Sequence, residues 1–229
     1  MKKFAFLASM ALLASLSAGV ARAGIVFDSL PPTVASTGLD SLGTYVMAQS
    51  FTTGSVASVI DSITLPLSSS DLSSGAAFVL AVYRDSGSGT PDDNGGMAGL
   101  YVPDSSVNSL SSTNYTFNSS SFLLNDVLAP NTRYWVGAWS SAIVTGVSSV
   151  NWHWTSSTSG VGVAGSLYAY STDAGSTWTT GAADVDGSYQ MQVVTSAVPE
   201  PGTMVLAGLV CGMGGVIYRR RAATKPAVA

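Results

Sequence analysis

Cysteine is absent from residues 24–198, because the single cysteine of the 229-residue chain is Cys211. This absence excludes disulfide bonds and thiolate zinc sites from that region. The region must therefore be stabilised by the burial of apolar side chains, and about 175 residues are enough to build such a core.

Lysine and glutamate are also absent from this region, which contains 12 Asp and only two basic side chains, Arg84 and Arg133. Its formal charge is therefore −10. A surface of this sign repels phosphate backbones, so nucleic-acid binding is not expected, and solubility or association with cations is favoured instead. Charged residues make up only 10% of the whole chain, which excludes a helical bundle or coiled coil rich in Glu, Lys and Arg.

Long apolar runs occur only near the two ends of the chain. At the N-terminus two lysines precede an apolar run at residues 4–16, and Ala21 and Ala23 supply the small side chains of a signal-peptidase site. This order is typical of a leader peptide. We expect residues 1–23 to be removed by signal peptidase and residues 24–198 to form the exported domain.

The C-terminal run spans residues 203–218 and is followed by three arginines, Arg219, Arg220 and Arg221. Their positive charges predict a stop-transfer signal that leaves residues 222–229 in the cytoplasm. A helix of this length would reach about 24 Å, whereas the hydrocarbon core of a bilayer is about 30 Å thick. The pattern therefore predicts a short transmembrane helix that acts as a transient single-pass anchor in the inner membrane.

The residues Pro199, Glu200 and Pro201 precede this apolar run. The chain therefore has, in order, a Pro-Glu-Pro motif, a short apolar helix and an arginine cluster. Residues 199–221 thereby resemble the PEP-CTERM sorting signal of Gram-negative bacteria. The resemblance implies processing by an exosortase and transfer to the cell surface or to an extracellular polysaccharide matrix, such as that of a biofilm. The alternative is a simple single-span anchor that follows a proline-rich kink.

Between the two ends, short apolar or aromatic runs alternate with turn-forming residues, and no helical periodicity extends over any length. Residues 189, 191 and 193 would share one strand face toward a core, with Gln190 and Gln192 on the opposite face in water. Trp152 and Trp154 would likewise share one face, directed inward. The sequence predicts an all-β fold, an antiparallel β-sandwich of jelly-roll or Greek-key type, flanked by the signal helix and the transmembrane helix. The expected strands are residues 45–51, 59–67, 76–83, 133–139, 150–154, 167–170 and 189–194.

Four short segments of this region also resemble the choice-of-anchor R type of domain, which occurs with several surface-anchoring tails. The resemblance lies in residues 48–54, 60–65, 82–85 and 128–136. It implies an extracellular β-sandwich, and no catalytic residues follow from it.

The residue types needed for catalysis are present without a pattern that selects them. His153 is the only histidine and would have to serve as the base of any Ser-His-Asp triad. Twelve Asp could supply a glycosidase pair, but no spacing singles out two of them. The glycines of residues 160–165 fit Gly-x-Gly-x-x-Gly but lack the strand-loop-helix context of a dinucleotide site, so they predict a flexible hairpin connection instead. We therefore expect no enzyme and no cofactor.

An acidic loop follows the expected strand at residues 76–83. Its oxygen-bearing side chains, Asp85, Asp92, Asp93 and Asn94, are ligand types that Ca²⁺ prefers. The spacing does not fit an EF-hand, and turns select the same residue types for conformational reasons. We expect turn formation here, with calcium binding as the alternative.

A second turn resembles the Asp-box of sialidases and other secreted β proteins. The matching residues are Ser171, Asp173, Gly175, Thr177 and Trp178. In those proteins the motif closes a β-hairpin, and a propeller would need several copies. The resemblance implies a structural turn without sialidase activity.

Aromatic side chains gather in the second half of the region and could include a platform for sugar rings. The members are Trp135, Trp139, Trp152, Trp154, Trp178, Tyr168 and Tyr170. The sequence as a whole favours a non-enzymatic structural protein of the cell surface or exopolysaccharide matrix. A carbohydrate-binding module is the alternative, and a secreted hydrolase is a weaker one.

Overall fold

The computed structural model describes residues 23–30, 35–43, 45–70, 77–103, 106–122, 126–140, 149–182 and 187–198. The chain divides into two units, Ala23–Ala197 and a second unit made of Met1–Arg22 with Val198–Ala229. Nearly all of the second unit lies outside the described residues, and with it lie the expected signal helix and transmembrane helix. Within the described part, no helix is long and apolar enough to cross a membrane.

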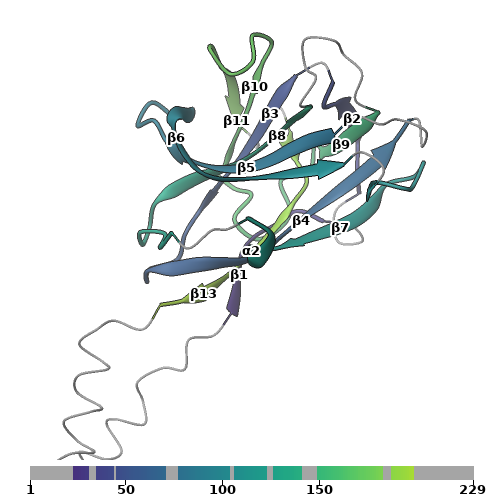
Figure 1. The fold of residues 1–229 in the computed structure, drawn as a ribbon. Coiled ribbons are helices and arrows are strands. Elements are labelled where there is room, and N and C mark those ends of the chain that lie inside the picture. The colour runs from purple at the N-terminus through teal and green to yellow at the C-terminus, as the bar shows by residue number, and fades with distance from the viewer. Residues whose placement is uncertain are drawn as a thin grey trace, which may run out of the picture. The chain divides into compact units, whose positions relative to one another are not determined.

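The described residues of the first unit form two antiparallel sheets (Figure 1). The seven-stranded sheet, here called sheet A, contains β1 (Ala23–Asp28), β2 (Gly38–Ser41), β4 (Ser58–Ser69), β7 (Thr113–Asn118), β9 (Val150–Thr155), β12 (Ser188–Tyr189) and β13 (Gln192–Ala197). The six-stranded sheet B has the order β11 (Thr179–Ala182), β10 (Leu167–Ser171), β3 (Val46–Thr52), β8 (Arg133–Ser140), β5 (Ala77–Asp85) and β6 (Pro91–Pro103). A short helical turn, α2 (Ser119–Phe122), follows β7.

The predicted all-β, antiparallel class is confirmed, and each expected strand has a counterpart within a few residues. Five strands were missed: β1, β2, β6, β7 and β11. The prediction of a loop for the acidic segment is partly wrong. β6 begins at Pro91 within this segment and pairs with β5 along most of its length. The glycine-rich and polar composition of β6 does not predict a strand. β6 is stabilised by its hydrogen-bond ladder with β5 rather than by an apolar pattern of its own.

The core lies between the two sheets. Sheet B contributes the alternating side chains Phe78, Leu80 and Val82, which are fully buried, and sheet A contributes Ile63 and Leu65. The layers meet directly where the ring of Phe78 packs edge-on against that of Phe117, with 6.2 Å between ring centroids. Strand alternation therefore places apolar side chains of both sheets in one shared core.

The segment of β12 and β13 lies in a fork of sheet A. β9 pairs with β4 only at Leu67–Ser69, and beyond that point β12 pairs with β9 while β13 pairs with β4. Gln190, expected on a solvent face, is instead fully buried at the fork, where its Nε2 donates to the Ser29 carbonyl at 2.7 Å. The expectation was wrong because both faces of this segment are covered.

The glycine segment at residues 160–165 connects β9 of sheet A with β10 of sheet B, so it is not the hairpin connection that its composition suggests. It lies against β1, where Val161 and Asp28 exchange two backbone hydrogen bonds of 2.9 and 3.0 Å. Gly162 has a φ of +71°, and a Cβ added there would lie 2.5 Å from the carbonyl oxygen of Val26. Only glycine fits this approach.

Replacing Gly162 by Ala should lower the free energy of unfolding by about 2–3 kcal/mol, because both the φ and the contact with Val26 become unfavourable. Gly165→Ala is the matched control, since Gly165 has a φ of +75° but no atom within 4 Å of an added Cβ. It should cost only about 1 kcal/mol, from the backbone conformation alone. Urea denaturation measures both, and equal losses would contradict the close approach.

Candidate functional site

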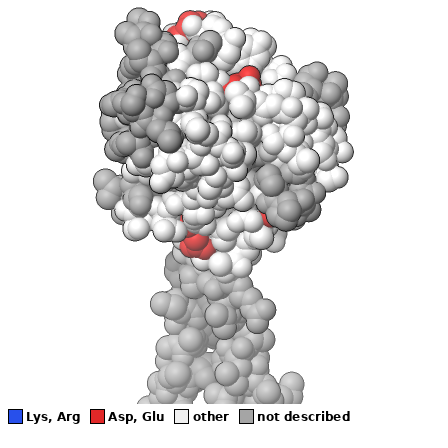
Figure 2. All heavy atoms as spheres, turned by 90° about the vertical axis from the view of Figure 1, so that its right-hand side faces the viewer, with Lys and Arg blue, Asp and Glu red and all other residues white. Residues whose placement is uncertain are grey.

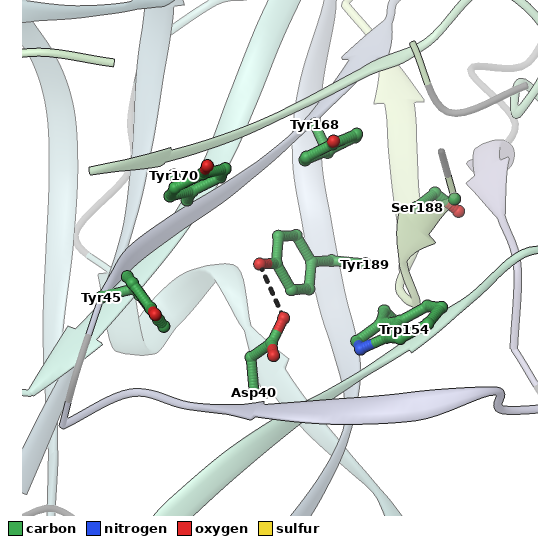
Figure 3. Close-up of a pocket in the computed structure, with 8 residues that line it drawn as sticks. Asp40, Tyr45, Trp154, Tyr168, Tyr170, Ser188 and Tyr189 are labelled. Atoms are coloured by element: carbon green, nitrogen blue, oxygen red, sulfur yellow. Dashed lines mark hydrogen bonds between the residues drawn. The ribbon is translucent and has the colours of Figure 1, made fainter. Parts of the chain in front are cut away.

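A pocket of about 300 Å³ lies where the two sheets meet near β10 and β12 (Figure 3). Both sheets contribute to it. Its lining residues are Asp40, Tyr45, Trp154, Tyr168, Tyr170, Gly187, Ser188 and Tyr189. Aromatic side chains therefore supply most of its walls.

Sheet B supplies one wall through β10 and the start of β3. Tyr168 and Tyr170 pair with Gln49 and Met47 of β3, so they share the inward face of the sheet, while Ala169 between them faces outward. Tyr45 stands just before β3 and packs edge-to-face on Tyr170, with 5.7 Å between ring centroids and an interplanar angle of 77°. Period-two alternation thus turns a Tyr-Ala-Tyr sequence into a pair of adjacent rings.

Sheet A supplies the opposite wall. Trp154 of β9 lies across Gly38 of β2, its directly paired residue, and a Cβ at Gly38 would come within 2.6 Å of the indole ring. The missing side chain of Gly38 is therefore what allows Trp154 to adopt this position. Two residues further along β2, Asp40 places a carboxylate in the pocket.

Tyr189 stands between these walls and is only 6% exposed. Its ring stacks on Trp152 at 5.0 Å and meets the edge of Tyr168 at 6.3 Å, while its hydroxyl donates to Asp40 Oδ2 at 3.0 Å. Burial, and then the neighbouring Asp40 carboxylate, raise the pKa of Tyr189 far above its ordinary value. The phenol is therefore protonated at every physiological pH and holds Asp40 in place as a donor.

The backbone of Tyr189 is held from the other sheet. Its N–H donates to Oε1 of the buried Gln49 at 3.0 Å, and Nε2 of Gln49 donates to the carbonyl of Leu167 at 3.1 Å. This one side chain connects β3, β10 and β12. The positions of Tyr189 and Tyr168 relative to one another therefore depend on a satisfied, buried amide.

Charge in the pocket has one sign. Among the described lining residues, Asp40 supplies the one carboxyl group, and no Lys, Arg or His lines the pocket. Figure 2 shows acidic side chains that stand apart from one another on the face it displays, with no Lys or Arg visible among the described residues. The pocket can accept hydrogen bonds and attract cations, and it offers no charged donor for an anion.

His153 lies outside this pocket, on the opposite face of β9 from Trp152 and Trp154. It is 8% exposed, and its ring nitrogens contact two serine hydroxyls, Ser68 Oγ at 2.9 Å from Nε2 and Ser36 Oγ at 3.1 Å from Nδ1. Burial lowers the pKa of His153, so the imidazole is neutral at pH 7. Within the described part of the chain no carboxylate contacts it, so a Ser-His-Asp arrangement is not present there.

The five tryptophans do not form one platform. Trp152 is fully buried in the core, where it donates to the Gln190 carbonyl at 2.7 Å, and Trp154 lines the pocket. Trp135, Trp139 and Trp178 lie on the outer face of sheet B, where the last two help to line a second hollow of about 260 Å³. The expected inward face of Trp152 and Trp154 is thus observed, and the aromatic group divides between two surfaces.

Asp85, the first candidate calcium ligand, makes contacts within the protein. Asp85 accepts from the Trp135 indole N–H at 3.0 Å and from the Gly87 backbone N–H at 2.8 Å, and it lies 3.9 Å from Arg133. The side chains of Asp93 and Asn94 lie outside the described residues. Over the described residues, no three His, Cys, Asp or Glu side chains gather in a way that could hold a metal ion.

The Asp-box-like turn joins β10 to β11 through local hydrogen bonds. Asp173 accepts from the Thr177 hydroxyl and backbone N–H at 2.7 and 2.8 Å and from the Ser171 hydroxyl at 2.7 Å. The donors at Thr177 and Ser171 lower the pKa of Asp173 to about 2. Ala174 and Gly175 both have positive φ, and the ring of Trp178 lies beneath Gly175.

The model of the PEP-CTERM protein-sorting motif matches residues 197–221 of the chain. The match includes Pro199, Glu200, Pro201 and the three arginines, all of which lie outside the described residues. No curated protein matches the chain. The motif makes the chain an exported protein with a C-terminal sorting signal and implies processing by an exosortase.

Sequence reasoning named Trp154, Tyr168 and Tyr170 but missed Asp40, Tyr45 and Tyr189 as pocket residues. The alternation of residues 189, 191 and 193 signalled the inward direction of Tyr189. Nothing in the sequence near Asp40 indicates its place, because β2 has only four residues and gains its position from pairing with β9. A pocket built across two sheets is a property of topology.

The neutral, buried state of His153 predicts a pH-dependent stability. Its folded pKa lies below the ordinary 6.5, so the unfolded chain binds a proton first as pH falls, and the free energy of unfolding decreases below about pH 6.5. His153→Gln should flatten this dependence between about pH 7.5 and pH 5.5, with a modest change at the upper limit. Denaturation at each pH checks it, and an unchanged slope in the variant would assign the effect to other groups.

Replacing Asp173 by Ala should lower the urea midpoint, because the Thr177 and Ser171 donors lose their acceptor. Asp173→Asn should lower it less, since an amide oxygen still accepts one of these bonds. The contribution of the carboxylate is present above pH 3.8 and is lost as pH falls through about 2, so the variants should lack this part of acid denaturation. The exposed Asp126 supplies the control, and a normal midpoint for Asp173→Ala would contradict a structural role.

Proposed function

We propose that this chain is a structural protein of the cell surface or extracellular polysaccharide matrix of a Gram-negative bacterium, released from the inner membrane by an exosortase. The observation that carries the proposal is the sorting motif at residues 197–221. β13 ends at Ala197, where the match begins, so the motif follows the sheets with no further strand between them. Cutting near the motif would leave every described strand intact.

The arrangement of the first and last strands supports processing at both ends. β1 pairs with β13, and Ala23 lies opposite Ser196 in the register. The expected signal-peptidase site before Gly24 and the end of β13, which precedes the sorting motif, are therefore close to one edge of sheet A. Removal of residues 1–23 would cost the sheet only the pairing of Ala23, because the rest of β1 remains.

We also propose that the domain is a β-sandwich of jelly-roll or Greek-key type. The chain passes from one sheet to the other at most of its connections, and hairpins within a sheet join only β5 to β6 and β10 to β11 among strands of sheet B. This alternation supports a sandwich of jelly-roll or Greek-key type. The segments at residues 48–54 and 128–136 that resemble choice-of-anchor R domains form β3 and β8 with the turn before it, two neighbouring strands of sheet B.

We further propose that the domain is not an enzyme. Two serine hydroxyls satisfy His153, and the Asp173 and Asp85 carboxylates accept hydrogen bonds within their own turns. These are the contacts of residues that stabilise a fold. A carbohydrate-binding role is the second candidate function, and the aromatic pocket with its single carboxylate is the observation that favours it.

Protein recovered from the culture medium or the matrix should lack both ends of the chain. Intact-mass measurement should show a species that begins at Gly24 and has lost the segment with Arg219, because signal peptidase and exosortase cut at the predicted sites. In a strain without exosortase activity the full C-terminus should persist in the membrane fraction.

Replacement of Glu200 by Ala within the motif should give the same retention, whereas the exposed Asp126→Ala should leave processing unchanged. Surface material that retains the three arginines would contradict exosortase processing and favour a simple membrane anchor.

A further inference from the structure

We propose that the pocket between the sheets binds a single pyranose ring of a saccharide without acidic groups, and that Asp40 is the residue that discriminates by charge. This inference rests on the carbohydrate-binding candidate above. It assigns that role to one site and to one chemical class of ligand, neutral or amine-bearing sugars. Uronic acids and other acidic sugars are excluded.

The walls suit a ring with apolar C–H faces. Tyr45, Tyr168, Tyr170 and Trp154 are half-buried, so each presents part of its ring to the pocket while the rest is packed. Figure 3 shows these rings placed around Asp40 and Tyr189 rather than in one plane. The faces and edges of aromatic rings bind C–H groups well, and a pocket of about 300 Å³ has room for one small ligand.

The polar groups suit a ligand that donates hydrogen bonds. The Asp40 carboxylate accepts one bond from the Tyr189 hydroxyl at Oδ2, and a carboxylate has about four lone-pair positions. Sugar hydroxyls and an ammonium group are donors that such an acceptor binds strongly. A ligand carboxylate at the same place would instead face a like charge, with no Lys, Arg or His among the described lining residues to offset it.

The site is also rigid before any ligand arrives. Tyr189 is fixed by stacking on Trp152, by its hydrogen bond to Asp40 and by the bond from its N–H to Gln49. The indole ring of Trp154 packs against Gly38 of β2. A ligand therefore loses little free energy to reorganisation of these walls.

Ligand-observed NMR titration of the purified full-length chain in detergent tests the charge rule with sugars that share one ring. The probes are methyl glucoside, glucosamine and glucuronic acid, with the corresponding galactose series. Glucosamine should bind most tightly and the neutral glycoside next. The uronic acid should bind at least about tenfold more weakly than glucosamine, the effect of one charge pair at an exposed pocket.

Asp40→Asn is the decisive variant, because an amide oxygen still accepts from the Tyr189 hydroxyl while the charge is removed. It should reduce glucosamine binding to the level of the neutral glycoside and reduce the exclusion of the uronic acid. Trp154→Leu should weaken all probes. Trp178→Leu is its matched control, another half-buried tryptophan that lies in the second hollow and not in the pocket, and it should leave binding unchanged.

Each outcome has a distinct meaning. Binding of the uronic acid as tightly as the neutral glycoside, or an unchanged ranking in Asp40→Asn with a native denaturation midpoint, would overturn the charge rule while leaving a carbohydrate-binding role intact. Binding lost in Trp178→Leu but not in Trp154→Leu would overturn the assignment of the pocket. No binding by any of the six sugars would overturn both, and the surface-sorting proposal would still stand on its own processing test.

Discussion

The buried side chain of Gln49 is the constraint on which the arrangement of this domain depends. β12 enters a fork of sheet A, and Gln49 of the other sheet accepts the hydrogen bond from the backbone N–H of Tyr189 in that strand. Nε2 of the same side chain donates to the Leu167 carbonyl in β10 and to the hydroxyl of Ser166 just before this strand. A buried polar group that is satisfied at both ends specifies one relative position of the sheets, because any shift leaves an unpaired donor in the core.

The relative position of the two sheets determines the dimensions of the pocket. Its walls come from β2, β9 and β12 of one sheet and from β3 and β10 of the other, so its dimensions follow from the distance and angle between the sheets. The tyrosines of β10 reach it because they share the face of Gln49, and Tyr189 reaches it because Gln49 holds its backbone. Core packing and ligand geometry are therefore set by the same contacts, which is a route to a rigid site without metals or disulfides.

The elements that could be predicted from the sequence are those whose pattern is local. Alternation at Trp152 and Trp154 and at Tyr189, Met191 and Val193 correctly indicated inward faces, and the seven apolar runs became strands. The strands β2, β6 and β11 could not be read, because polar or glycine-rich segments become strands only through a partner. Alternation wrongly predicted a solvent-exposed Gln190, because the fork in sheet A covers both faces of this segment. Asp40 lies at the site because of the register between β2 and β9, which no local sequence pattern encodes.

The acidic composition of the domain bears on the pocket through Asp40. Twelve Asp and no Lys or Glu occur in residues 24–198, yet several of the described Asp are used within the fold: Asp173 and Asp85 in turns and Asp28 at Gln192. Asp40 differs because it accepts its hydrogen bond from the Tyr189 phenol, whose pKa is raised far above its ordinary value, and because it lines a pocket with aromatic walls. A carboxylate held in this way has charge and acceptor capacity left for a molecule from outside, and a negative field over the surrounding surface strengthens its preference for neutral or cationic groups. The acidic composition, from which we expect no nucleic-acid partner, thus agrees with the proposed preference of Asp40 for sugars without acidic groups.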